Sequence, residues 1–257
     1  MTIATITLIG GPTALIELDG FRLLTDPTFD DPGDYTLPHA ILKKTAKPAL
    51  AADRIGAVDA VLLSHDQHSD NLDVSGRAFL QKADRVFTTE AGAGRLGGNA
   101  QGLRPWETTE VAKGNSSALD IMATPARHGP IGIEPLSGDV VGFVISSRTK
   151  AFKPLYITGD TVWFDGVAEV QRRFAPGLVL LFAGAAQTRG KLNLTMNAND
   201  AIEAAFAFAG AVIVPIHTDG WAHFTESGDD LEKAFKALGH GGRMRRLQPG
   251  VPTVFEL

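Results

Sequence analysis

Short apolar stretches with a strand-like alternation open the chain. Three of them, at 3–9, 14–18 and 21–25, are separated by glycine-containing turns, which is the pattern of strands joined by hairpins. They predict a hairpin-rich sheet edge. Residues 29–50 have only a weak period and contain several Pro and Gly residues, so they predict a long loop with at most one short helix.

A different pattern of apolar positions starts at residue 57. It predicts a strand (57–63), a helix (72–82) and another strand (85–88), which together form a βαβ unit. Further strands are predicted near 107–112, 118–125, 139–147, 155–158, 178–182, 211–215 and 253–256, and further helices near 90–96, 166–174, 197–209 and 226–238. No linker-like tract interrupts this alternation. We therefore expect an α/β fold of two packed sheets with helices outside, in a single domain spanning 1–257.

The composition is that of a globular protein. Hydrophobic residues make up 44% of the chain and charged residues 21%, which allows a sizeable core. The net charge of −5 gives no general attraction to nucleic acids or anionic membranes. No apolar run is long enough for a membrane span, and the start lacks the basic flank of a secretory signal. We expect a soluble cytoplasmic protein, with a homo-oligomer left open.

Histidine and aspartate side chains gather where predicted strands end. The members of this set are His65, His68, Asp70, His128, Asp160, His217 and His223. Cysteine is absent, so any metal ion must bind His, Asp, Glu or Asn, and imidazoles with carboxylates suit zinc, iron or manganese. The alternative for the densest segment, 64–73, is a solvated loop in which Asp70 or Asn71 caps a helix. Four strand ends with the same pattern favour one common site.

The order His65/His68/Asp70, His128, Asp160 and His217 resembles the metallo-beta-lactamase superfamily, in particular its L-ascorbate-6-phosphate lactonase-like branch. The segments 6–17 and 24–27 resemble the entrance of that branch, and 215–217 resembles its last ligand motif. The resemblance implies a four-layer αβ/βα sandwich. It also implies one or two divalent metal ions at the sheet edges, with zinc as the first choice and manganese, iron or nickel as alternatives.

The first ligand motif departs from the superfamily pattern His-x-His-x-Asp-His. Here the spacing is His65-x-x-His68-x-Asp70-Asn71, so His65 is displaced by one residue, and a local bulge would restore its reach. The other frame, anchored on His65, loses more ligands because it places Gln and Ser at the next two positions. Asn71 stands where a histidine is expected and offers only a neutral oxygen. We expect the second metal site to be impaired or altered.

The resemblance also implies roles for the individual residues. The first ion would bind His65, His68 and His128, the second would bind Asp70 and His217, Asp160 would bridge them, and Asn71 is a candidate ligand. Such ions would activate a water for attack on a carbonyl or phosphoryl centre. Asp70 would orient this water. His223, with Trp221, would line the pocket or donate a proton, the alternative being an aromatic residue packed on a loop beside a surface histidine.

These residues together indicate a metal-dependent hydrolase acting on a small-molecule ester, lactone or phosphoester. A phosphodiesterase or nuclease is the first alternative, although the acidic chain counts against long nucleic acids as partners. The second alternative is a catalytically silent metal- or ligand-binding protein, which the Asn71 replacement favours.

Two further signals carry less weight. The glycines at 92–97 match a bare dinucleotide-binding pattern, but they lack a convincing acid after a following strand, so we interpret them as a glycine-rich helix end. Arg127, Arg189 and Lys191 lie near predicted active-site loops and could meet an anionic group of a substrate.

Overall fold

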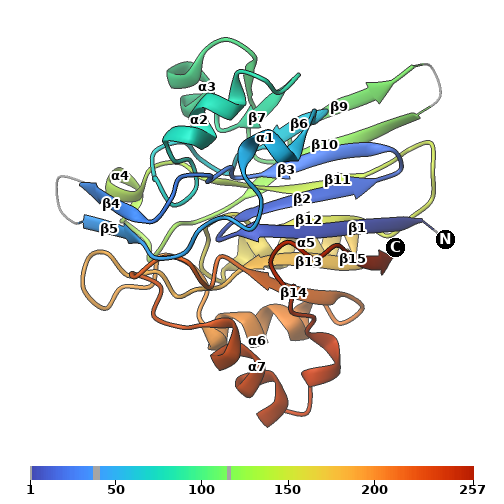
Figure 1. Ribbon diagram of the computed structural model, residues 1–257. Coiled ribbons are helices and arrows are strands. Elements are labelled where there is room, and N and C mark those ends of the chain that lie inside the picture. The colour runs from blue at the N-terminus through green and yellow to red at the C-terminus, as the bar shows by residue number, and fades with distance from the viewer. Residues whose placement is uncertain (1, 37–40, 115–116) are drawn as a thin grey trace.

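Two mixed β-sheets lie face to face in the computed structural model, which describes residues 2–36, 41–114 and 117–257 (Figure 1). In spatial order, the first sheet consists of β15 (Thr253–Glu256), β1 (Ile3–Gly10), β2 (Thr13–Leu18), β3 (Phe21–Thr25), β6 (Ala60–Leu62), β7 (Val86–Thr88) and β8 (Ala100–Gly102). The second consists of β14 (Val212–Ile216), β13 (Leu178–Phe182), β12 (Leu155–Ile157), β11 (Val141–Ser146), β10 (Ser117–Pro125) and β9 (Thr108–Lys113).

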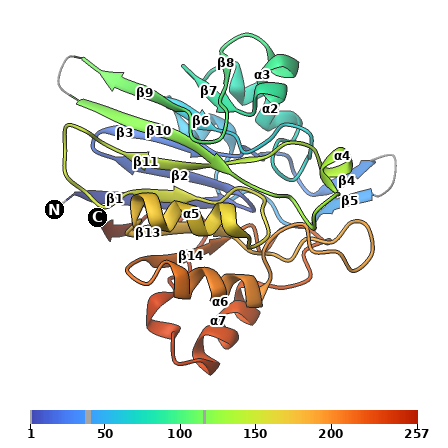
Figure 2. The same cartoon turned by 180° about the vertical axis from the view of Figure 1, so that it is seen from behind.

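Helices cover the outer faces of both sheets (Figures 1 and 2). The helices are α1 (Ala52–Ile55), α2 (Val74–Leu80), α3 (Glu90–Leu96), α4 (Glu134–Ser137), α5 (Asp165–Phe174), α6 (Ala198–Ala207) and α7 (Gly228–Ala237), with a 3₁₀ turn at Gly241–Arg243. Phe79 of α2 packs in one apolar cluster with Val61 and Val86 of the first sheet. Val167 of α5 packs in another with Val179 of the second sheet. The result is the expected α/β sandwich with helices outside.

The alternation of side chains along β13 shows how one strand serves two cores. Leu178, Leu180 and Phe182 belong to the cluster between the sheets, whereas Val179 and Leu181 pack against the helices. Successive residues of a strand point to opposite faces, so a strand that is covered on both sides is apolar throughout. The parallel pairs β12–β13 and β13–β14 carry the predicted β-α units, and β6 and β7 pair in parallel as predicted.

The opening strands were predicted to form the edge of a sheet, but they lie inside it. The hairpins β1–β2 and β2–β3 form as expected, but the prediction of a sheet edge was wrong because β15 pairs with β1 along Ile3–Ile6. The chain end thus returns to cover the first strand. No periodicity within the opening segment could reveal a partner strand whose paired residues lie 247 to 253 positions away along the sequence.

The segment predicted as a long loop contains a hairpin. The strands β4 (Gly33–Thr36) and β5 (Ile41–Lys44) pair antiparallel, and the first helix begins only at Ala52. Residues 37–40 of this segment lie outside the described residues. The period of β5 is hard to detect because its two inward residues are Leu42 and Lys44, and the buried Lys44 ammonium pairs with Asp73 at 2.9 Å.

Two smaller predictions also needed correction. The short strand β8 was missed, since its three residues give too few positions for a period. Helix α2 starts at Val74, later than predicted, and its N-cap is Asp73, whose side chain accepts a hydrogen bond from the Gly76 amide. The cap is therefore neither Asp70 nor Asn71. Across the described part of the chain, no helix has the length and apolar character needed to cross a membrane.

Candidate metal centre

The loops that follow β6, β10, β12 and β14 lie at one end of the sandwich, opposite the two chain termini (Figure 1). These loops carry the strand-end histidines and aspartates, which lie together. Both sheets contribute to this cluster. His65, His68 and Asp70 follow β6 of the first sheet, whereas His128, Asp160 and His217 follow β10, β12 and β14 of the second. They form two groups, one of three histidines and one of Asp70, Asp160 and His217, and within each group the donor atoms lie within 4.8 Å of one another.

The first group presents imidazole nitrogens to a common point. His65 Nε2 and His128 Nε2 lie 2.8 and 3.1 Å from His68 Nδ1. The outer nitrogens are already used, because His128 Nδ1 donates to the Leu194 carbonyl oxygen at 2.8 Å and His65 Nδ1 donates to Ser64 Oγ at 2.9 Å. The carbonyl can only accept, and the serine hydroxyl gives its own hydrogen to another acceptor. Both inner Nε2 atoms of the neutral rings therefore carry lone pairs.

These lone pairs are the observation that fits a metal ion. At most one hydrogen, on His68 Nδ1, is available to the two Nε2 lone pairs that face it. Three convergent imidazole nitrogens without enough hydrogens between them are a donor set for a divalent cation.

The second group sets two carboxylates around one imidazole. Asp160 Oδ1 lies 2.9 Å from His217 Nδ1, and Asp70 Oδ2 lies 3.6 Å from His217 Nε2. Asp160 Oδ2 also lies 3.5 Å from His128 Nε2, so Asp160 faces both groups. Two ligands of one zinc ion lie about 3.0 to 3.4 Å apart, given metal–ligand bonds of about 2.1 Å. The separations in both groups are close to this spacing.

Burial and charge set the protonation of the imidazoles in opposite ways. Burial lowers the pKa of His65 well below its usual value, and it lowers the pKa of His68 to about 4. These two rings are neutral at physiological pH, which is the form that binds metal. Burial also opposes the charge on His217, but the Asp160 carboxylate outweighs it and raises the pKa of His217 to about 10. His217 therefore holds a proton that a metal ion would have to displace.

Both carboxyl groups of the second group are ionised. Burial by itself would raise the pKa of Asp160, but the charge of His217 holds it below its usual value. The same opposition acts on Asp70, where the charges and hydrogen bonds of His223 and His217 outweigh burial and lower the pKa. Two buried carboxylates are thus available as charged ligands.

Unusual backbone conformations hold the ligand-bearing turns. Gly159, directly before Asp160, has φ +62°, and a Cβ there would lie 2.6 Å from the Val141 carbonyl oxygen. Only glycine, which has no Cβ, permits this close approach of the two backbone segments. His217 itself has φ +57°, and its amide donates to the Gly11 carbonyl oxygen at 2.9 Å. Such a conformation is costly for a residue with a side chain and clusters at functional sites.

Asn71, His223 and Trp221 differ in the contacts that their side chains make. Asn71 is fully buried, and its Nδ2 lies 3.3 Å from Asp160 Oδ1, which is the geometry of a hydrogen-bond donor. His223 reaches Asp70, with Nε2 2.9 Å from Oδ2. Trp221 packs against Tyr35 at 5.3 Å between ring centroids, which agrees with the packing alternative for this residue.

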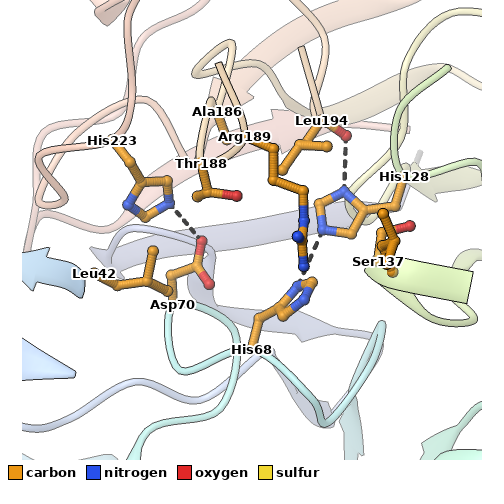
Figure 3. Close-up of a pocket in the computed structure, with 11 residues that line it drawn as sticks. Leu42, His68, Asp70, His128, Ser137, Ala186, Thr188, Arg189, Leu194 and His223 are labelled. Atoms are coloured by element: carbon orange, nitrogen blue, oxygen red, sulfur yellow. Dashed lines mark hydrogen bonds and ion pairs between the residues drawn. The ribbon is translucent and has the colours of Figure 1, made fainter. Parts of the chain in front are cut away.

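A cavity of about 380 Å³, including its opening to solvent, lies beside both groups. It is lined by Leu42, His68, Asp70, His128, Leu136, Ser137, Ala186, Thr188, Arg189, Leu194 and His223. Figure 3 shows Arg189 reaching from its loop toward His68 and His128, with His223 and Asp70 on the other side. Arg127 instead stacks over Phe164, and Arg127 and Lys191 are not among the lining residues. The glycines at 92–97 belong to α3 and its C-cap, as interpreted.

The sequence did not predict the hydrogen bonds that orient the His65 ring. Asp26, directly after β3, accepts hydrogen bonds from the Ser64 amide and hydroxyl, and Ser64 Oγ accepts from His65. No sequence pattern predicted a role for Ser64, and the segment 24–27 with Asp26 indicated only a family resemblance. An aspartate at the end of a strand parallel to β6 was the signal that could have placed it in the site.

Comparisons with known proteins agree with this arrangement. A family model described as a beta-lactamase superfamily domain matches residues 21–218. The chain is 28% identical to the UPF0173 protein YddR of Bacillus subtilis, over 97% of this chain and 99% of that protein. It is 25% identical to a UPF0173 metal-dependent hydrolase of Ignicoccus hospitalis, with 100% of both chains covered.

A solved structure shares the fold. The isothiocyanate hydrolase from Delia radicum gut bacteria superposes with a TM-score of 0.85 at 23% identity, over 98% of this chain and 100% of that one. The fold is thus the metallo-beta-lactamase sandwich that the resemblance implied. Since the family model matches well over half of the sequence, the chain belongs to the beta-lactamase superfamily.

Proposed function

We propose that the protein is a metal-dependent hydrolase that uses a metal-activated water on a small ester, lactone or phosphoester. The observation that carries the proposal is the pair of adjacent donor groups, which share Asp160 and open into one cavity. Relatives named metal-dependent hydrolases along the whole chain support it. When bound, the ions supply a nucleophilic water near neutral pH and polarise the bond to be broken.

The chain's own residues would hold and orient the reacting groups. His65, His68 and His128 would bind the first ion through neutral imidazoles, and Asp70 with His217 would bind the second. Asp160 would contact both ions, because its two oxygens face the two groups. Zinc suits the histidine-rich group best, with manganese, iron and nickel as the other candidates.

The cavity supports a small substrate with an apolar part. Leu42, Leu136 and Leu194 line it, and an apolar lining with a few polar groups is typical of small-molecule sites. Arg189 reaches toward the donor groups (Figure 3), where a guanidinium could bind a carboxylate or phosphate of the substrate. The net charge of −5 supports a small molecule over a nucleic acid as partner.

The test begins with metal per chain in protein purified without added metal, followed by assays with aryl esters, lactones and bis-p-nitrophenyl phosphate. We expect bound metal and hydrolysis of at least one class, abolished by a chelator and restored by zinc or manganese. His65→Ala and Asp160→Ala should lower the rate at least about 100-fold. His240→Ala is the control and should leave the rate unchanged, because the His240 ring packs on Phe206 of α6.

Two results would overturn the proposal. Hydrolysis that survives both His65→Ala and Asp160→Ala would exclude the metal mechanism. A metal-loaded protein that is inactive on all three substrate classes would favour a silent binding protein on this fold.

A further inference from the structure

The second donor group lacks an imidazole from the first ligand loop. Position 71, directly after Asp70, holds Asn71, and its side-chain nitrogen lies 3.3 Å from Asp160 Oδ1 and 3.5 Å from Ser64 Oγ. The neighbours dictate this orientation. Asp160 is a carboxylate, and the Ser64 hydroxyl already donates to Asp26, so both can only accept from the amide. Asn71 therefore turns hydrogens, not lone pairs, toward the group.

His223 brings an imidazole to the same place from the other end of the chain. Its Nε2 lies 2.9 Å from Asp70 Oδ2, and that oxygen lies 3.6 Å from His217 Nε2. These distances bracket the roughly 3.0 to 3.4 Å expected between two ligands of one ion. The His223 side chain is only 8% exposed, and Figure 3 shows it facing Asp70 across the cavity from His128.

The segment that carries His223 is held on both sides. The Ala222 amide donates to the Lys43 carbonyl oxygen at 2.9 Å, and the His223 carbonyl oxygen accepts from the Gln187 amide at 3.0 Å. The ring of Phe224 packs edge-on against both His217 and His223, with centroid distances of 4.5 and 4.6 Å. The position of His223 beside the second group is thus built into the fold.

We propose that His223 is a ligand of the second metal ion and replaces the histidine that position 71 lacks. The second ion would then bind Asp70, Asp160, His217 and His223, a set of two carboxylates and two imidazoles that suits zinc, iron or manganese. This assignment rests on the proposed function in that it requires the chain to bind metal. It makes the second site complete, although the first ligand motif has lost one histidine.

The test counts metal ions per chain after equilibration with a buffered, limiting concentration of free zinc. We expect two ions in the unchanged protein and one in His223→Ala, with the affinity for the second ion lowered on the order of 100-fold or more. His223→Gln separates the two roles of this residue. A glutamine amide can still donate to Asp70, so the second ion would persist if His223 only oriented that carboxylate, and it should be lost if His223 is a ligand.

Cobalt substitution gives a readout that does not depend on activity. The cobalt-loaded protein should lose the paramagnetically shifted imidazole signals of the second site, those of His217 and His223, in both His223 variants. His240→Ala, whose ring packs on Phe206, should keep all of them. His223→Gln, close in size to histidine, keeps the test decisive even if the alanine variant folds poorly.

The outcomes separate the two proposals. Protein without any bound ion would contradict the proposed function itself. Two ions retained in His223→Gln, whatever His223→Ala shows, or a single ion in the unchanged protein, would overturn only the assignment of His223.

Discussion

Asp26 Oδ1 accepts two hydrogen bonds from Ser64, one from the amide at 2.9 Å and one from the hydroxyl at 2.6 Å. Through that hydroxyl the buried carboxyl fixes the outer nitrogen of His65, and hence the direction of its inner lone pair. Residues that orient metal-binding imidazoles in this way influence affinity without touching the ion.

Ser64→Ala should weaken the first metal site while leaving the fold intact. The substitution removes the acceptor for His65 Nδ1, so the ring would lose its preferred tautomer and orientation. We expect a roughly 10- to 100-fold lower affinity for the first ion, measured by competition with a chromogenic chelator. Ser147→Ala, which removes a hydroxyl bonded to the Ala118 carbonyl oxygen at the far end of the sheet, is the control. An equal effect of the two substitutions would contradict the positioning role.

Asp26 should give the metal-free protein a stability that falls as pH rises. Burial raises the pKa of Asp26 from 3.8 to about 8, so the folded state binds this proton more tightly than the unfolded chain does. The stabilisation is complete below pH 3.8 and is lost as pH rises toward 8. Asp26→Asn cannot titrate, so urea unfolding should show the unchanged protein losing stability relative to this variant over that range. A constant difference between the two would contradict the raised pKa.

Metal uptake should release a proton from His217. The pKa of this residue is raised to about 10, so at about pH 6, below the pKa of a zinc-bound water, it is charged in the metal-free protein. His65 and His68 are neutral there. Calorimetric titration in buffers of different ionisation enthalpy should detect proton release on metal uptake, and less of it in His217→Gln than in the unchanged protein. Equal release in both proteins would refute His217 as a source.

Gly159→Ala should destabilise the protein by more than backbone strain alone. The new Cβ would lie 2.6 Å from the Val141 carbonyl oxygen and 3.0 Å from Ser64 Cβ, in addition to the left-handed φ, so we expect a loss of roughly 2 to 4 kcal/mol. Gly20→Ala is a matched control, because Gly20 has φ +81° and no described atom within 4 Å of the added carbon. It should lose only about 1 kcal/mol in urea unfolding. Equal losses would show that the close approach is not limiting.

The pattern of apolar positions along the chain was enough to predict the elements that are long or fully buried. Residues 178–182 were predicted as a strand and form β13 with the same bounds, because every position carries a large apolar side chain and the small residues Gly177 and Ala183 flank the run. The hairpin of β4 and β5 could not be predicted in this way. Its inward Lys44 is tolerated only because Asp73, 29 residues later, neutralises it, and the sequence does not show that pairing.

The sequence predicted which residues gather at the candidate site better than it predicted the contacts between them. Strand-end positions brought His128, Asp160 and His217 to one edge, since the carboxyl ends of strands in a sheet gather loops into one place. The displaced His65 still reaches His68, and the preferred frame and the ligand roles stay predictions. The partners of Asn71 and His223 depend on which loops meet in space. No spacing along the chain encodes that His223 lies beside Asp70, 153 residues earlier.

The donor groups draw on both sheets, and this has a mechanical consequence. Asp70 belongs to the first sheet and His217 to the second, and 147 residues separate them. An ion bound to both residues would cross-link two distant parts of the chain. Because the ion binds only where these ligands have come together, it would stabilise the folded state relative to the unfolded chain. A chelator would then do more than stop chemistry. It would also remove a link between the two sheets at this end, and the apolar residues of the inner cluster should then become more accessible to proteases.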